Sequence, residues 1–566
     1  MSDLLVRVGN ESHAFNMDSL TPIWSPGLAM PDVWVAPRAM GASGYFFEIE
    51  VSNGSANVGG KGRPLVTGAV VTITPPSGYE LLDPYALPFP TQYGVQRGTF
   101  RRFGLAKVGI AQDERRRINE FTLGKMRSNF DAAHFGPADL PLPTIPAAQH
   151  DPMRSRDMSA FWACLTAAKA GKVFAYEDTE DGICNPPTPG VGCYGGSSDR
   201  AAPAGSRIQH ARGYQQSDGA ARLFLLFAML DVIRCRVQYR RGSGSPFSAS
   251  DYGATMADYK PASGSTNDRL PEFQGLTNPD TTPEEFDPAH RVRQDGNLIA
   301  AYEMTGSAAC ARLILCNGEE QRMIYPDNGP PPAYGFTPSN VKNWKDWLLA
   351  SAARQYRGYP GTLFGRQIGW SAWIVAEALK IDPTRGGLAT WAAAMLDCAT
   401  LSAMPTGICQ RVHEEPLFND AAHDSCQAFE VPIFWLGMYA LMRRVQGIVT
   451  VWPILDACHA LYDSDPQPGG GPFHFTYVAN AGGAPYPIPL TTGKGADAPP
   501  AAPGDPAHAE CLLGLAYLIS GDAHWLDRSA KFGLGQPFPD WQSKRLALES
   551  KLAGWQPTLL AAMQRA

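Results

Sequence analysis

The feature that most constrains the fold is a change in the spacing of apolar residues near residue 155. Before it, runs such as GYFFEIEV (44–51) and LVTGAVVTIT (65–74) are rich in the β-branched and aromatic residues of strands. After it, apolar residues recur every three or four positions, as in 297–316 and 427–447. Because one spacing suits strands and the other suits helices, we predict an α+β multidomain chain with its strands first.

The first part of the chain, residues 1–127, is predicted to be a β-rich domain. We expect a small sandwich of two antiparallel sheets, in which 98–111 adds a further hairpin. The proline-rich stretch 75–90 indicates sheet edges and loops. Residues 128–154 are rich in Pro and Ala and are predicted to be a linker to an all-α domain over 155–566.

The helical part carries a repeated helix ending. Tyr302–Gly306 and Tyr517–Gly521 each end a helix with glycine and lead into a second helix, which is typical of an αα-hairpin. The segments that end at Ile381 and Gly447 have the same shape. Recurrence at intervals of roughly 60 to 80 residues suggests hairpins arranged in a ring or a solenoid. The remaining predicted helices span 158–172, 217–241, 341–359, 366–381, 390–401, 450–462, 509–522 and the closing segment.

Composition and charge exclude several classes of partner. The net charge of −6 gives no electrostatic reason to expect nucleic acid or an anionic membrane. No run of 18 apolar residues occurs, because Asp231 interrupts 223–233, so we expect no membrane insertion. The N-terminus lacks the basic and apolar regions of a signal peptide, which predicts cytoplasmic synthesis.

The 11 cysteines are scattered, and none forms a CxxC pair, so we expect buried, reduced thiols. Cys184 and Cys193 flank a proline-rich loop, and they either form a disulfide or remain separate thiols. The 13 Trp and 20 Tyr fit a large core, but such rings also stack on sugar faces.

A family resemblance appears at Asp287-Pro-Ala-His290 and at Asn297-Leu-Ile-Ala-Ala-Tyr302-Glu-Met-Thr-Gly306. Following a β domain and a linker, these residues resemble (α/α) toroid proteins that process polysaccharides, in which an AYxxTG helix end recurs once per hairpin. Gly365-Arg366-Gln367-Ile-Gly-Trp370 and Ala376-Glu377-Ala378-Leu379 resemble a toroid inner helix. The similarity spans residues 200–530 and is to rhamnogalacturonan-lyase-like and heparinase- or alginate-lyase-like proteins. Where some alginate lyases have Asn-Asn-His, this chain has Asn419-Asp-Ala-Ala-His423. The resemblance implies a toroid of helical hairpins with long loops on one face.

Three polar clusters could supply the chemistry. A uronide lyase needs a group that neutralises the substrate carboxylate, a base and an acid, whereas a glycoside hydrolase needs two carboxylates about 5 to 10 Å apart. The clusters lie at 207–214, 287–293 and 411–427, each just before a predicted helix. Each also has a structural interpretation as loop packing, helix-entry ion pairs or capping. In the third, Asp424 or Ser425 alone would suffice as the cap, and the surplus polar residues favour a function.

We assign roles within these clusters as hypotheses. The candidate catalytic residues are His423, Glu415, His413, His290 and Tyr214. The candidate substrate-binding residues are His210, Arg212, Arg291, Arg293, Arg366, Trp370 and Asn419. Arg366 and Trp370 share a helix face and either meet an acidic sugar or belong to the core.

Other motifs are weak. His413, His423 and the nearby acids could hold a metal, but HExxH and EF-hand spacings are missing, so we expect no metal and no cofactor. His459 and His508 are interpreted as ordinary helix and loop histidines. No GxSxG motif supports acyl transfer.

Two functions remain open. The first is a lyase- or hydrolase-like enzyme, or a glycan-binding protein, that acts on a bacterial or acidic polysaccharide. The alternative is a bacteriophage virion protein, a tail or head-decoration component, which uses the toroid for host glycan binding or assembly. It would be released as part of a virion and would contact copies of itself or other virion subunits.

Overall fold

The computed structural model describes the residues that follow, and only these are discussed: 3–19, 21–25, 32–52, 55–56, 70–84, 99–125, 177–178, 184–185, 225, 228, 239–240, 296–324, 368–402, 423–427, 430–445, 452–459, 476–480, 512–513, 515–517 and 519–525. The chain divides into two compact units. The first comprises 1–136 with 145–320, and the second comprises 137–144 with 321–566. The first unit therefore contains the β region together with a helical hairpin.

The smaller sheet has the order β2-β1-β7, with β1 at Leu4–Val8, β2 at Glu11–Phe15 and β7 at Val71–Thr74. All its pairings are antiparallel. In β1 the side chains alternate between buried and exposed, so that Leu4, Val6 and Val8 face inward. Gly9 turns the chain into β2 with a φ of 58°, a conformation that glycine adopts without strain.

The larger sheet has the order β3-β4-β5-β9-β8 and is antiparallel throughout. Its strands are β3 (Ile23–Ser25), β4 (Asp32–Ala39), β5 (Gly44–Ser52), β8 (Tyr79–Leu82) and β9 (Thr99–Lys107). The strand predicted at 44–51 is confirmed as β5. The hairpin predicted at 98–111 is wrong, because Thr99–Lys107 is one long strand that pairs with β5 on one side and β8 on the other.

The two sheets share one hydrophobic core. From the smaller sheet it includes Val6 and Phe15, and from the larger sheet it includes Val35, Phe47 and Phe103. The predicted antiparallel β region is thus confirmed, and its core lies between the inward faces of the sheets.

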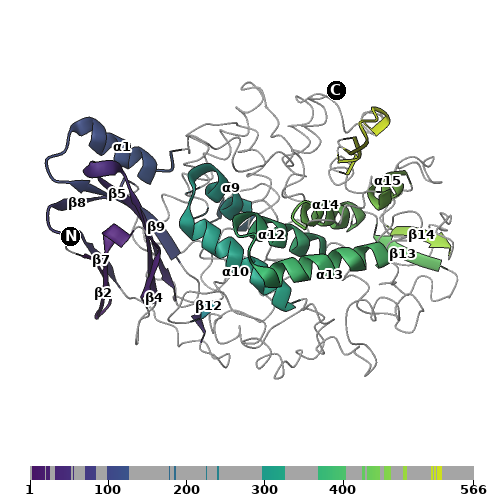
Figure 1. Ribbon diagram of the computed structural model, residues 1–566, viewed down its shortest axis with the longest axis horizontal. Coiled ribbons are helices and arrows are strands. Elements are labelled where there is room, and N and C mark those ends of the chain that lie inside the picture. The colour runs from purple at the N-terminus through teal and green to yellow at the C-terminus, as the bar shows by residue number, and fades with distance from the viewer. Residues whose placement is uncertain are drawn as a thin grey trace. The chain divides into compact units, whose positions relative to one another are not determined.

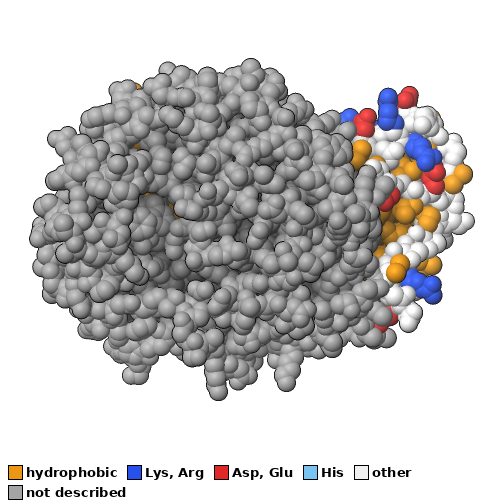
Figure 2. Space-filling view, turned by 180° about the vertical axis from the view of Figure 1, so that it is seen from behind, with side chains coloured by type: hydrophobic (Ala, Val, Ile, Leu, Met, Phe, Trp, Pro, Cys, Tyr) orange, Lys and Arg blue, Asp and Glu red, His pale blue; other side chains and the backbone are white. Residues whose placement is uncertain are grey.

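On the side seen in Figure 2, the visible side chains of this region carry charges of both signs among apolar ones.

Helix α1 (Gln112–Thr122) follows β9 directly and packs on the larger sheet, as Figure 1 shows at the left. The contact is close because Gly104 of β9 has no side chain. A Cβ there would lie 2.8 Å from Ile118 Cγ2 and 2.9 Å from Thr122 Oγ1. This helix was not among those expected from the sequence.

A helical hairpin consists of α9 (Gly296–Thr305) and α10 (Ala308–Ile324), and it belongs to the first unit as far as residue 320 of α10. Gly306 ends α9 with a φ of 66°, and its N–H donates to the carbonyl of Tyr302 at 2.8 Å. Ser307 then caps α10, since its Oγ accepts from the N–H of Cys310 at 3.2 Å. The hairpin predicted from Tyr302–Gly306 is confirmed.

The second unit contains α12 (Ile368–Ile381), α13 (Gly386–Ser402), α14 (Glu430–Met442) and α15 (Trp452–Cys458). Helices α12 and α14 cross at glycines. A Cβ on Gly437 would lie 2.0 Å from the carbonyl oxygen of Gly369, and a Cβ on Gly369 would lie 2.5 Å from that of Ile433. The two backbones therefore approach each other more closely than any side chain at these positions would allow.

The second unit also contains a pair of strands. β13 (His423–Gln427) pairs antiparallel with β14 (Thr476–Asn480). The structural interpretation of Asp424 or Ser425 as a cap of the following helix is wrong, because both lie within β13 and α14 begins only at Glu430. The partner strand lies some fifty positions along the chain, where local sequence gives no sign of it.

None of the described helices is long and apolar enough to cross a membrane.

Candidate functional site

Two of the predicted site residues lie within described elements. Trp370 lies in α12, and His423 is the first residue of β13, where its backbone faces Asn480 of β14. The others lie outside the described residues: His210, Arg212, Tyr214, His290, Arg291, Arg293, Arg366, His413, Glu415 and Asn419. The possible Cys184–Cys193 disulfide also lies outside them, because Cys193 is not described.

The best-defined polar site lies on the outer face of the larger sheet. We name it the charged cluster and define it as Glu48, Glu50, Arg102 and Arg312. Alternation along β5 explains why the glutamates share one face, since Phe47 and Ile49 point into the core. Arg102 stands directly opposite Glu48 on β9.

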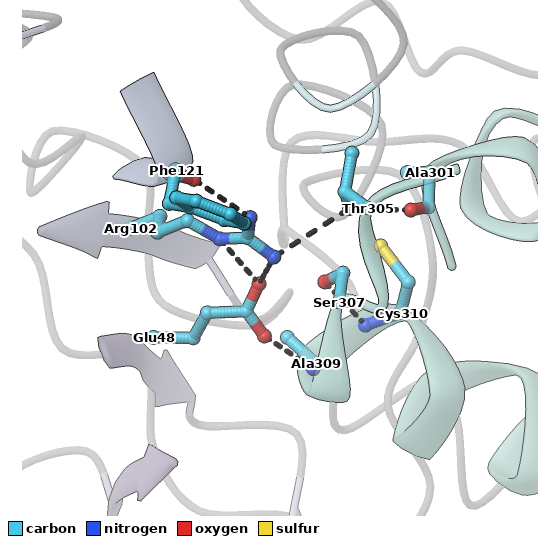
Figure 3. A network of polar contacts seen from close by, with 8 residues as sticks. All are labelled: Glu48, Arg102, Phe121, Ala301, Thr305, Ser307, Ala309 and Cys310. Atoms are coloured by element: carbon cyan, nitrogen blue, oxygen red, sulfur yellow. Dashed lines mark hydrogen bonds and ion pairs between the residues drawn. The ribbon is translucent and has the colours of Figure 1, made fainter. Parts of the chain in front are cut away.

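The first ion pair of the charged cluster joins Arg102 to Glu48 (Figure 3). Arg102 donates from Nε at 2.9 Å and from Nη2 at 2.6 Å to the same oxygen, Oε1 of Glu48. Its Nη1 donates to the carbonyl of Phe121 at 3.1 Å, and its guanidinium lies 5.0 Å from the centre of the Phe46 ring. The two charged side chains are 1% and 2% exposed, so the pair is withdrawn from water.

The other oxygen of Glu48 reaches the helical hairpin. Oε2 accepts from the backbone N–H of Ala309 at 2.8 Å, in the first turn of α10 (Figure 3). Arg102 also contacts Thr305 Oγ1 at 3.5 Å, and Thr305 in turn donates to the carbonyl of Ala301 at 2.5 Å. A carboxylate at a helix N-terminus satisfies an amide that has no partner within the helix and also interacts favourably with the helix dipole.

The second ion pair joins Arg312 of α10 to Glu50 of β5. The guanidinium of Arg312 lies 5.0 Å from the ring centres of both Trp24 and Trp34. These tryptophans stand opposite each other on β3 and β4, so they hold the cation from two neighbouring strands. Ala309 and Arg312 are three residues apart and therefore lie on one face of α10, which is the face that meets the sheet.

The geometry of the charged cluster suits a structural joint rather than an acid–base site. Two carboxylates on one strand could serve a hydrolase only if a sugar and a water reached them. Glu48 and Glu50 are 2% and 0% exposed, and each is paired with an arginine. The cluster balances two negative and two positive charges, and its hydrogen bonds fix the α9–α10 hairpin on the sheet.

The charged cluster is not among the sites predicted from the sequence. The sequence does contain a signal that Glu48 and Glu50 lie on one face, since they occupy alternate positions of an otherwise apolar strand. Polar side chains at such positions usually face solvent. In the structure these glutamates face α10 instead. The hydrogen bond between Glu48 and Ala309 joins residues that are 261 positions apart in the sequence.

Among the described residues, no group of three His, Cys, Asp or Glu side chains is placed to hold a metal ion. Cys310, Cys316, Cys398 and Cys458 are buried and form no disulfides.

Comparison of the chain with protein-family models, with curated proteins and with solved structures gives no match.

Proposed function

We propose that the chain degrades or binds a polysaccharide and that its helical hairpins close into an (α/α) toroid. The observation that carries the proposal is the recurrence of one glycine-closed helix ending in two distant segments, at Gly306 and at Gly521. It supports a regular array of hairpins, which is the architecture that the sequence resemblance implies. The proposal places the ligand at the loops that connect the hairpins.

The two helix endings agree in detail. Gly306 and Gly521 have φ values of 66° and 71°, and their N–H groups donate to Tyr302 and Tyr517 at 2.8 and 2.7 Å. In both, the next residue begins the capping of the following segment. Ser307 accepts from Cys310, and Oδ1 of Asp522 accepts from the N–H of His524 at 2.9 Å.

A second described hairpin, α12–α13, turns at Asp382. Its Oδ1 accepts from the N–H of Thr384 at 3.1 Å and from the Thr384 hydroxyl at 2.6 Å. The hydroxyl hydrogen bond lowers the pKa of Asp382, with further contributions from the Thr384 amide and from Arg385. The turn lacks glycine but uses the same device, a short polar side chain that satisfies the first amides after a helix end.

The proposed chemistry remains that of the 411–427 cluster. His413, His423 and Glu415 would act as base and acid, while Arg366 would neutralise a substrate carboxylate and Trp370 would stack on a sugar. His290 and Tyr214 are the alternative acid–base pair. The polysaccharide would be oriented by the remaining candidate residues, which are His210, Arg212, Arg291, Arg293 and Asn419.

The test is incubation of the full-length protein with purified polyuronates and bacterial capsular polysaccharides. Products are measured as reducing ends and as the ultraviolet absorbance of the unsaturated uronide that a lyase leaves. We expect product from at least one polymer, with a loss of about 100-fold or more in His423→Ala, because a general acid or base contributes at least this factor. His508→Ala, interpreted as an ordinary loop histidine, is the matched control.

Each other outcome decides between alternatives. Retention of a polysaccharide without cleavage would restrict the proposal to binding. A protein that forms oligomers and neither cleaves nor retains any polymer would contradict the proposal and fit the virion alternative.

A further inference from the structure

Helix α15 presents an unusual combination of side chains on its exposed face. Trp452 is 70% exposed, the most of the large apolar side chains among the described residues. A single exposed apolar residue is ordinary on a protein surface, so the residues beside Trp452 determine whether it indicates a binding site. Asp456 and His459 follow it by four and seven residues, a spacing that places all three on one side of a helix.

Burial along α15 agrees with this spacing. Ile454, Ala457 and Cys458 are buried, which assigns them to the opposite side of the helix. Asp456 is half-buried, and His459, directly after the last turn, is exposed. The exposed side therefore carries a flat apolar ring, a carboxylate and an imidazole in a row.

A second segment holds the imidazole in place. The His459 ring contacts Trp525 at 4.6 Å between ring centres, edge to face, and His524 contacts the same indole at 5.1 Å. Trp525 is 2% exposed and is therefore a fixed support. Two histidines thus stand beside one buried ring, at the end of the row that begins with Trp452.

We infer that Trp452, Asp456 and His459 form a binding site for a neutral pyranose residue of a polysaccharide. The inference rests on the proposed function and extends it, because it assigns the chemical class of one bound sugar. A pyranose has an apolar face that matches the Trp452 ring and hydroxyls at its edge that can donate to Asp456 and bond with His459. The Asp456 carboxylate would repel a uronate, which selects an uncharged sugar at this position.

The test uses the full-length protein labelled with 5-fluorotryptophan and studied by fluorine NMR. Trp452→Phe identifies the Trp452 resonance by removing it. The protein is titrated with neutral gluco-, manno- and galacto-oligosaccharides and, separately, with an oligogalacturonate. We expect the Trp452 resonance to shift with at least one neutral oligosaccharide and not with the oligogalacturonate. Asp456→Asn and His459→Ala should weaken that binding about tenfold or more, as expected where a bound hydroxyl loses its partner.

Val108→Ala is the matched control, because Val108 is also highly exposed, at 65%, but lies in the first unit. It should leave the titration unchanged. A Trp452 resonance that no neutral oligosaccharide moves would overturn the inference, and it would do so even if the protein cleaves a polyuronate. A Trp452 resonance that shifts with a neutral oligosaccharide, in a protein that cleaves no polysaccharide, would support the inference and would restrict the proposed function to binding.

Discussion

Arg102 and Glu48 face each other at directly paired positions of β9 and β5 and share two hydrogen bonds to a single carboxylate oxygen. The second oxygen of Glu48 binds the first turn of α10. One buried ion pair therefore links two strands and a helix that lie far apart in the sequence. This relationship explains why the β region and the α9–α10 hairpin form a single unit.

Removing either partner of this pair should destabilise the protein strongly. Arg102→Met leaves the Glu48 carboxylate buried without its cation, and Glu48→Gln leaves Arg102 without its anion. We expect each to lower the free energy of unfolding by about 3–5 kcal/mol, since an uncompensated buried charge is costly. Guanidinium chloride denaturation followed by circular dichroism measures the loss.

The double variant Glu48→Gln with Arg102→Met should lose less than the sum of the single losses, because no charge is then left unpaired. Arg116→Ala is the control. Its pair with Asp113 is exposed, and we expect a change within about 0.5 kcal/mol. Strictly additive losses in the double variant would contradict the assigned pairing.

The glycine crossing of α12 and α14 predicts a second large effect. Gly437→Ala places a Cβ 2.0 Å from the carbonyl oxygen of Gly369, so the helices must move apart. We expect a loss of about 1–3 kcal/mol or more in thermal or chemical unfolding. Gly386→Ala is the matched control, because a Cβ there meets nothing within 4 Å at the start of α13, and helix propensity predicts a small gain. Equal effects of the two substitutions would show that the crossing is not close.

Substitution of Gly521 tests how much the left-handed backbone conformation at this helix ending contributes to stability. The φ of Gly521 is 71°, and a Cβ would have no neighbour within 4 Å, so Gly521→Ala adds only left-handed strain. We expect a loss of about 1–2 kcal/mol in stability. Gly521→Asn should lose less, because asparagine tolerates this conformation better. Equal stability of the glycine and alanine proteins would mean that the helix ends in another way.

Tyr45 predicts a dependence of stability on pH. Burial and the hydrogen bond that its hydroxyl donates to Asp18 at 3.0 Å raise the pKa of Tyr45 to about 12. A pKa raised in the folded state contributes stability that is complete below the ordinary tyrosine pKa, near 10, and is lost as the pH rises toward 12.

We therefore expect Tyr45→Phe to lose stability against the natural protein at pH 8 to 9, and the difference to shrink between about pH 10 and 12. Urea denaturation at a series of pH values measures it. A difference that grows with pH over this interval would rule out the Asp18 hydrogen bond as its cause.

The sequence predicts elements whose signals are local. GYFFEIEV carries its own strand pattern, and the Tyr302–Gly306 and Tyr517–Gly521 endings depend on glycine within one helical turn. The hairpin β1–β2 has such a signal too, in the alternation of Leu4, Val6 and Val8 before Gly9, although no individual strand is predicted there.

What the sequence could not provide is pairing at a distance. Asp424 looks like a helix cap because a polar residue precedes an apolar helix, yet its backbone pairs with Ala479. Likewise, no local signal distinguishes Glu48 and Arg102 from a solvated strand face, because their contacts are with α10 and with Phe121 of α1, outside the strands. In both places, local propensity yields to contacts formed by distant segments.

The measurement that tests the account most directly is electrophoresis of the native full-length protein through gels that contain single purified polysaccharides. We predict that at least one polymer slows the protein relative to a plain gel, and that Trp452→Ala reduces this retardation while Val108→Ala does not. Identical mobility in every gel, for a protein that also yields no product in solution, would contradict a carbohydrate ligand.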